Sequence, residues 1–162
     1  MSAVEVVRLV GQSVWDDYFT FCFERNPWDR ALSLFHWRNR SAGEANLQEF
    51  IKSGRLSNLK RKGSQLYMDG DSIMVDRICL YENYDEELRE LTSQLGFEEP
   101  LIAPRAKGNV RPRRQAAMFT QQDIDYIGEE FRSEINRLGY KYEQTGSPIT
   151  TTQSDAGSAR PS

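Results

Sequence analysis

The sequence is poor in cysteine, histidine and long apolar runs. Cys22, Cys79 and His36 are the only cysteines and histidine among 162 residues, and their spacing matches no zinc motif or disulfide framework. Both cysteines fall in predicted strands, so we expect free buried thiols in a reducing compartment. No run approaches the roughly 18 apolar residues of a membrane helix, and the N-terminus has no signal-peptide pattern. These absences predict a cytoplasmic protein without a membrane segment or metal.

Positive charge is concentrated in one short segment. The formal net charge is −3, yet five basic residues lie close together: Arg105, Lys107, Arg111, Arg113 and Arg114. A nucleic-acid-binding surface is usually basic over a whole face, so we expect no nucleic-acid partner. One basic loop on an acidic chain favours a small polyanion, although a solvated surface loop is the alternative.

Turn and capping signals divide the chain into alternating strands and helices. We predict a strand over 18–24, a helix from Pro27 to about Arg38, and a short helix that ends at Gly54. Further on, the pattern predicts an exposed loop over 55–63, a hairpin with strands 66–68 and 73–81, a helix capped by Asn83, and a last helix capped by Thr120. This alternation is typical of a three-layer α/β domain over 1–143, followed by a disordered tail over 144–162.

The segment from Tyr18 to Ser33 carries the strongest functional signal. A strand ends at Arg25, Asn26 is a good helix N-cap, and Pro27 fits the first helical position. A helix N-terminus attracts anions, and the planar guanidinium of Arg25 suits bidentate phosphate contact. Ser33, further along the helix, adds a hydroxyl. The junction therefore predicts a phosphate-binding site formed by Arg25 and Ser33.

The same segment resembles the 3′-phosphate-binding motif of carbohydrate-type sulfotransferases, which use 3′-phosphoadenosine 5′-phosphosulfate (PAPS). The matching residues are Phe21, Phe23, Arg25, Asn26, Pro27, Trp28, Asp29, Arg30 and Ser33. A looser similarity continues to about Tyr142. The resemblance implies a P-loop-kinase-like fold with a parallel-centred sheet, PAPS as co-substrate, no metal, and sulfuryl transfer to a hydroxyl or amine of a carbohydrate or related metabolite. It places Arg25 and Ser33 on the 3′-phosphate, and Lys107 and Arg111 in a loop over the nucleotide.

The chain departs from that family at its N-terminus. The loop that holds the 5′-phosphosulfate, commonly Pro-Lys-Thr followed by small residues, has no counterpart in 1–17, and no catalytic residue is carried over. We expect a packing role for His36. The domain is predicted to be incomplete at its N-terminus, with a partner segment as a possible source of the first unit, and an upstream anchor would change the location to a membrane-associated or Golgi-type one. A non-catalytic remnant that keeps only the 3′-phosphate site is the alternative function. A P-loop kinase relative would need a Walker lysine and a magnesium-binding acid, which the sequence does not offer.

Overall fold

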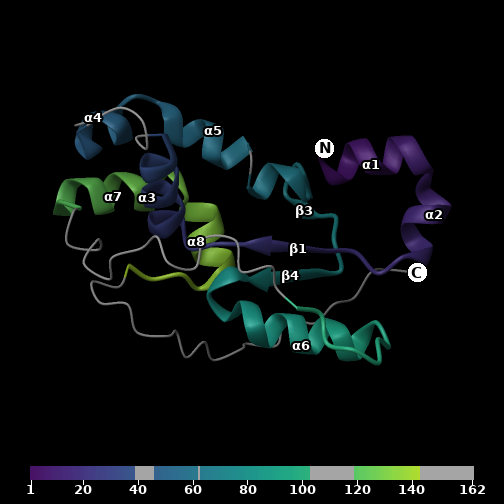
Figure 1. Ribbon diagram of the computed structural model, residues 1–162. Helices are drawn as coiled ribbons and strands as arrows, with labels where there is room; N and C mark the ends of the chain where they lie inside the picture. The colour runs from purple at the N-terminus through teal and green to yellow at the C-terminus, as the bar shows by residue number, and fades with distance from the viewer. Residues whose placement is uncertain (39–45, 62, 103–118, 143–162) are drawn as a thin grey trace.

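The computed structural model describes residues 1–38, 46–61, 63–102 and 119–142, in which helices surround a small parallel sheet (Figure 1). Lys107, Arg111 and the predicted tail 144–162 lie outside the described residues. The helices are α1 Ala3–Val10, α2 Gln12–Asp17, α3 Pro27–Arg38, α4 Leu47–Lys52, α5 Arg55–Arg61, α6 Tyr84–Gln94, α7 Gln121–Glu130 and α8 Arg132–Leu138, with one-turn 3-10 helices η1 Ser64–Leu66 and η2 Tyr81–Asn83.

The parallel sheet consists of β1 Phe21–Glu24 and β4 Arg77–Leu80, whose arrows point the same way in Figure 1. Glu24 is paired with Leu80 at the end of the ladder. Both strands therefore end at one edge, and the residues that follow them are brought together. The predicted strand began too early: Tyr18 is the exposed C-cap of α2.

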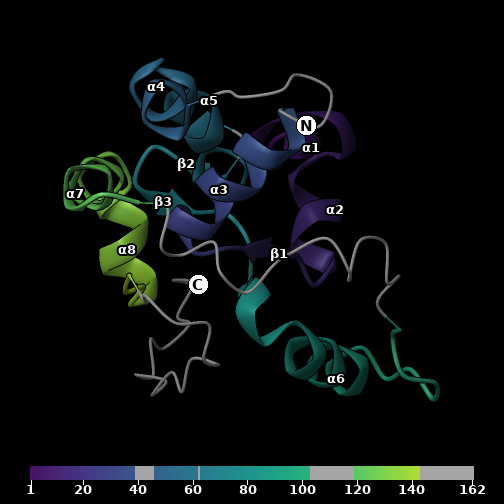
Figure 2. The ribbon, with the colours of Figure 1, turned by 60° about the vertical axis from the view of Figure 1, so that its left-hand side comes forward.

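Helices lie on both sides of this sheet (Figure 2). The side chains of α6 pack with Cys79 of β4, and Phe19 and Phe23 are packed against this cluster. On the other side lies the larger core, built from α3, α4, α5, α7 and the residues around Phe131. The structure thus combines helices with a small parallel sheet, as in the α/β class. Its assignment to a P-loop-kinase-like fold stays a prediction.

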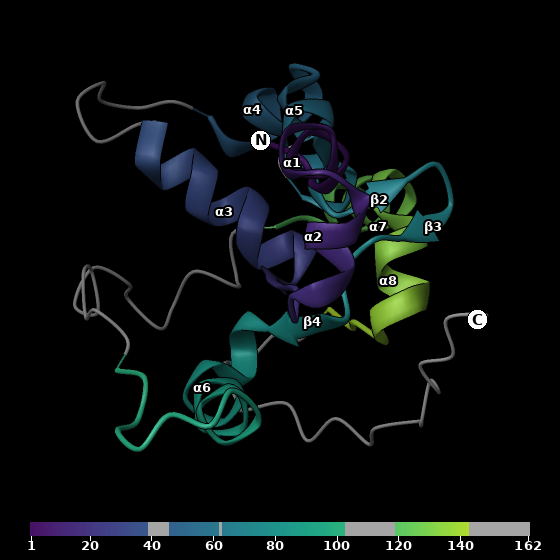
Figure 3. The same cartoon turned by 90° about the vertical axis from the view of Figure 1, so that its right-hand side faces the viewer.

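The predicted hairpin is shorter than expected. Antiparallel β2 Met68–Asp69 and β3 Ser72–Ile73 flank Gly70, whose φ of 57° suits a tight turn. The predicted strand over 73–81 is wrong as one element, because its second half is β4, which pairs with β1 and lies apart from the hairpin in Figure 3. Asp76 marks the change of partner: its Oδ2 accepts from Thr20 N at 2.8 Å and from Thr20 Oγ1 at 2.7 Å.

Two other elements differ from the prediction. The expected loop over 55–63 contains α5, because Leu56 and Leu59 lie three residues apart on one helical face and are both buried. The predicted helix after Thr120 is two helices, α7 and α8, that meet at Phe131. Its predicted capping box between Thr120 and Asp123 is confirmed. Asn83 makes no side-chain cap for α6, since η2 leads directly into that helix.

Candidate functional site

The carboxyl edge of the parallel sheet gathers the residues that could receive a ligand. Arg25 and Asn26 follow β1, whereas Tyr81 and Glu82 follow β4. In open α/β sheets, ligands bind outside the carboxyl ends of the strands. The sequence prediction that Arg25 stands at such an edge agrees with this placement.

Arg25 is mostly buried, and its guanidinium is held by contacts on two sides. It lies over the ring of Tyr81, with Cζ 4.7 Å from the ring centroid. Its Nη2 donates to Asp29 Oδ2 at 3.0 Å, one turn into α3, and only 15% of the side chain is exposed. Nε is buried and has no hydrogen-bond partner among the described residues. The guanidinium is therefore held beside the first turn of α3, and its Nε–H makes no hydrogen bond among the described residues.

Asn26 caps α3 and joins three parts of the chain. Its Oδ1 accepts from Trp28 N at 3.1 Å, which is the predicted N-cap contact. Its backbone N–H donates to Glu82 Oε1 at 2.8 Å, and its Nδ2 donates to the carbonyl of Lys141 at 3.0 Å. The start of α3 is thus fixed to the end of β4 and to the segment after α8.

Ser33 lies one helical turn beyond Asp29 in α3. Asp29 and Ser33 are four residues apart in one helix, so their side chains are neighbours on its surface. Ser33 is partly exposed. An anion at this face would meet the Arg25 guanidinium and the Ser33 hydroxyl, but it would also meet the carboxylate of Asp29.

Two carboxyl groups make the site less positive than the sequence suggested. Burial raises the pKa of Glu82, while the N–H of Asn26 and the charge of Arg25 lower it in part. One oxygen of this carboxyl group, Oε2, is buried and has no hydrogen-bond partner among the described residues. Asp29 is 54% exposed and belongs to the motif itself.

Sequence reasoning missed Tyr81 and the contact between Glu82 and Asn26. Arg77 is paired with Glu87 and Glu90 of α6. No local pattern could have shown this, because the contact between Glu82 and Asn26 joins residues 56 positions apart. His36 lies against Phe35, with ring centroids 5.3 Å apart, which is a packing contact. Lys107 and Arg111 cannot be placed relative to the site because they fall outside the described residues.

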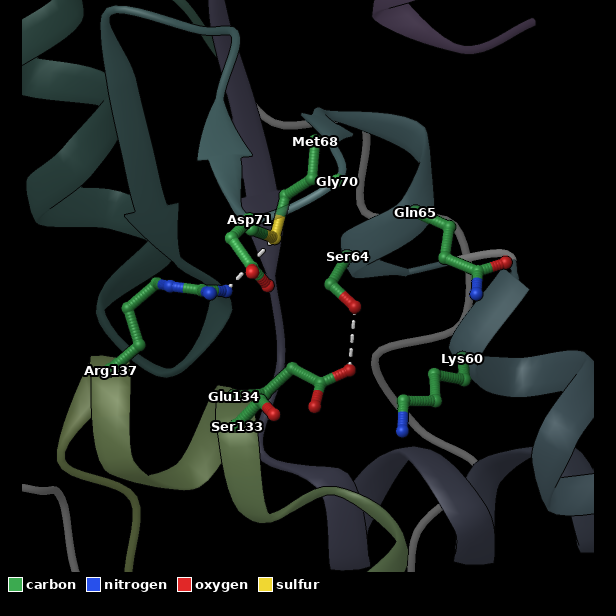
Figure 4. A pocket seen from close by; sticks show the side chains of 9 residues that line it. All are labelled: Lys60, Ser64, Gln65, Met68, Gly70, Asp71, Ser133, Glu134 and Arg137. Carbon is green, nitrogen blue, oxygen red and sulfur yellow. Dashed lines mark hydrogen bonds between the residues drawn. The ribbon is translucent and has the colours of Figure 1, made fainter.

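A separate pocket of about 360 Å³ lies between α5, η1, the β2–β3 hairpin and α8 (Figure 4). Its polar side chains are engaged with one another: Ser64 Oγ donates to Glu134 at 2.6 Å, and an Arg137 nitrogen lies 3.0 Å from Met68 Sδ. Lys60 Nζ donates to the carbonyl of Glu130 at 3.0 Å. None of the residues predicted to bind a ligand lines this pocket. The Ser64–Glu134 hydrogen bond joins η1 to α8, and the pocket does not extend the candidate site.

The described residues contain no group of three or more histidine, cysteine, aspartate or glutamate side chains arranged to hold a metal ion. None of the helices in the described ranges is both long and apolar enough to cross a membrane.

Comparison with known proteins finds similarity to an archaeal protein. An uncharacterized protein of Archaeoglobus fulgidus is 32% identical over 106 residues, which cover 62% of this chain and 87% of that protein. No family model matches the chain. No solved structure matches it either.

Proposed function

We propose that this chain, which belongs to the same family as the uncharacterized Archaeoglobus fulgidus protein, is the part of a PAPS-dependent sulfotransferase domain that binds the nucleotide. In this proposal the carboxyl edge of the sheet binds the 3′-phosphate of PAPS or of its product, adenosine 3′,5′-bisphosphate. Arg25 supplies the charge-assisted contact and Ser33 a hydroxyl.

The orientation of Arg25 is the single observation that carries the proposal. A mostly buried guanidinium is held on the ring of Tyr81 and paired with Asp29, which lies one helical turn before Ser33 in α3. Such pre-orientation lowers the entropic cost of gripping a phosphate. The exposed ring of Tyr81 adds a flat surface beside the guanidinium, on which a nucleotide base can stack.

Sulfuryl transfer depends mainly on holding donor and acceptor in line and on stabilising charge at the departing oxygen. The proposed donor is PAPS and the proposed acceptor is a hydroxyl or amine of a carbohydrate or related metabolite. Binding of the 3′-phosphate supplies binding energy at a point remote from the reacting sulfuryl group, and this energy can be used to position that group. In this proposal Lys107 and Arg111 belong to a loop over the nucleotide and strengthen its binding.

Calorimetry with two nucleotides tests the proposal. Adenosine 3′,5′-bisphosphate should bind, whereas adenosine 5′-monophosphate, which lacks the 3′-phosphate, should bind much more weakly. A charge-assisted hydrogen bond contributes about 1.5–3 kcal/mol, so Arg25→Ala should weaken bisphosphate binding by about tenfold to a hundredfold. Ser33→Ala should cost less, because a neutral hydroxyl makes a weaker bond.

Arg132→Ala is the matched control. The side chain of Arg132 is 66% exposed and paired with Glu129 on the surface of the neighbouring helix, so its loss should leave nucleotide binding unchanged. Equal affinities of folded Arg25→Ala and wild-type protein would refute the assignment, as would equal binding of the two nucleotides.

A non-catalytic binding module that keeps only the 3′-phosphate site is the alternative function. A transfer assay with radiolabelled PAPS and a panel of acceptors separates the two. Arg25-dependent transfer supports the enzyme, while bisphosphate binding without transfer supports the module.

A further inference from the structure

Two consecutive residues after β4 contact two consecutive residues after β1. Tyr81 lies under the guanidinium of Arg25, and Glu82 accepts from the backbone N–H of Asn26 at 2.8 Å. Glu82 is therefore attached to the backbone directly beside the predicted phosphate-binding arginine. Its second oxygen, Oε2, is buried and has no hydrogen-bond partner among the described residues.

We propose that Glu82 is a positioning residue that fixes the Arg25–Asn26 turn, and that anion binding at Arg25 is coupled to uptake of a proton by the Glu82 carboxyl group. This inference rests on the proposed anion site. It adds a second residue and a pH dependence that the motif does not contain.

The charges around Glu82 give the coupling its direction. From the β1–α3 junction, Arg25 and Asp29 face it, and Tyr140 approaches from the segment after α8. Burial already raises the pKa of Glu82, and the Asp29 carboxylate raises it slightly further, against the opposing effects of the backbone N–H groups of Asn26 and of Glu82 itself and of the Arg25 charge. A bound dianion would add a repulsion and would draw part of the Arg25 charge away from Glu82.

The protonated form keeps the structural contact. One oxygen of a neutral carboxyl group still accepts from Asn26 N–H, and the other becomes a donor. Oε2 makes no hydrogen bond among the described residues, so an O–H group there could donate to an incoming anion oxygen or to a water molecule. Glutamine reproduces this pattern, with a carbonyl acceptor and an N–H donor.

Binding of inorganic sulfate to the full chain provides the test, because sulfate does not change its charge over the pH range used. Wild-type affinity should be about tenfold higher at about pH 5 than at about pH 8, because a bound anion raises the pKa of Glu82 and binding is then accompanied by proton uptake. Glu82→Gln should bind at pH 8 as tightly as the wild type does at pH 5, with a flat profile. Glu82→Ala, which loses the Asn26 contact, should bind about tenfold more weakly than Glu82→Gln.

The matched control is Glu90→Gln. Glu90 lies on α6 and pairs with Arg77 of β4, so the pH profile of this variant should be that of the wild type. Equal pH profiles for wild-type protein and Glu82→Gln overturn the inference. So does the absence of sulfate binding in every variant, because Glu82 then has no ligand to control. Glu82-dependent sulfate binding without any preference for adenosine 3′,5′-bisphosphate supports the inference and refutes the nucleotide assignment, so the two failures are distinguishable.

Discussion

Removing Arg30 should destabilise the fold far more than removing a surface arginine. Arg30 is paired with Glu24, whose side chain is only 3% exposed, and its guanidinium lies 4.9 Å from the centroid of the Phe131 ring. Arg30→Met leaves a buried carboxylate without its cationic partner, although it still accepts from the backbone N–H of Arg25 at 3.2 Å. Breaking a buried ion pair from one side costs about 3–5 kcal/mol. For a domain of this size, that cost lowers the melting temperature by about 10 °C or more.

Urea unfolding followed by circular dichroism measures the free energy of unfolding. Arg132→Met is the control, since the Arg132–Glu129 pair is exposed and should contribute less than about 1 kcal/mol. The double variant Glu24→Leu with Arg30→Met should be more stable than Arg30→Met alone, because it removes both charges and fills the site with apolar atoms. Additive losses, or equal losses for Arg30→Met and Arg132→Met, would refute the reasoning.

Two further predictions concern the thiols and the basic segment. Burial raises the pKa of both Cys22 and Cys79 to about 12, so iodoacetamide should modify the folded protein about a hundredfold or more slowly than the urea-unfolded chain, as followed by mass spectrometry; equal rates would contradict this burial. If Lys107 and Arg111 contribute to the proposed nucleotide site, adenosine 3′,5′-bisphosphate should slow amide hydrogen exchange over 106–114; unchanged exchange at saturating ligand would remove these residues from the proposal.

Local signals predicted the parts of the fold that are built from neighbours in sequence. The start of α3 at Pro27, the capping box at Thr120 and the turn at Gly70 all depend on contacts within a few residues. Those contacts leave recognisable residue types at fixed spacings. Arg25 at the strand end belongs to the same class, which is why the core of the candidate site could be found from the sequence.

The errors arose where distant pairing decides the structure. The segment 73–81 reads as one strand, but it divides because its second half pairs with β1, and the pairing is reinforced by Asp76 and Thr20, 56 residues apart. The contact between Glu82 and Asn26, also 56 residues apart, was missed for the same reason. Tertiary contacts of this kind leave no period in a single sequence.

The charges at the carboxyl edge imply that the described residues form only part of an anion site. Arg25 is one positive charge, and the carboxyl groups of Asp29 and Glu82 both act on it. Arg30 is already committed to Glu24. A phosphate monoester brings close to two negative charges, so strong binding requires protonation of a carboxyl group, additional cations, or both. Protonation of Glu82 supplies the first of these. The basic segment with Lys107 and Arg111 is the chain's densest source of the second, and this is the physical reason to keep those two residues in the proposed site.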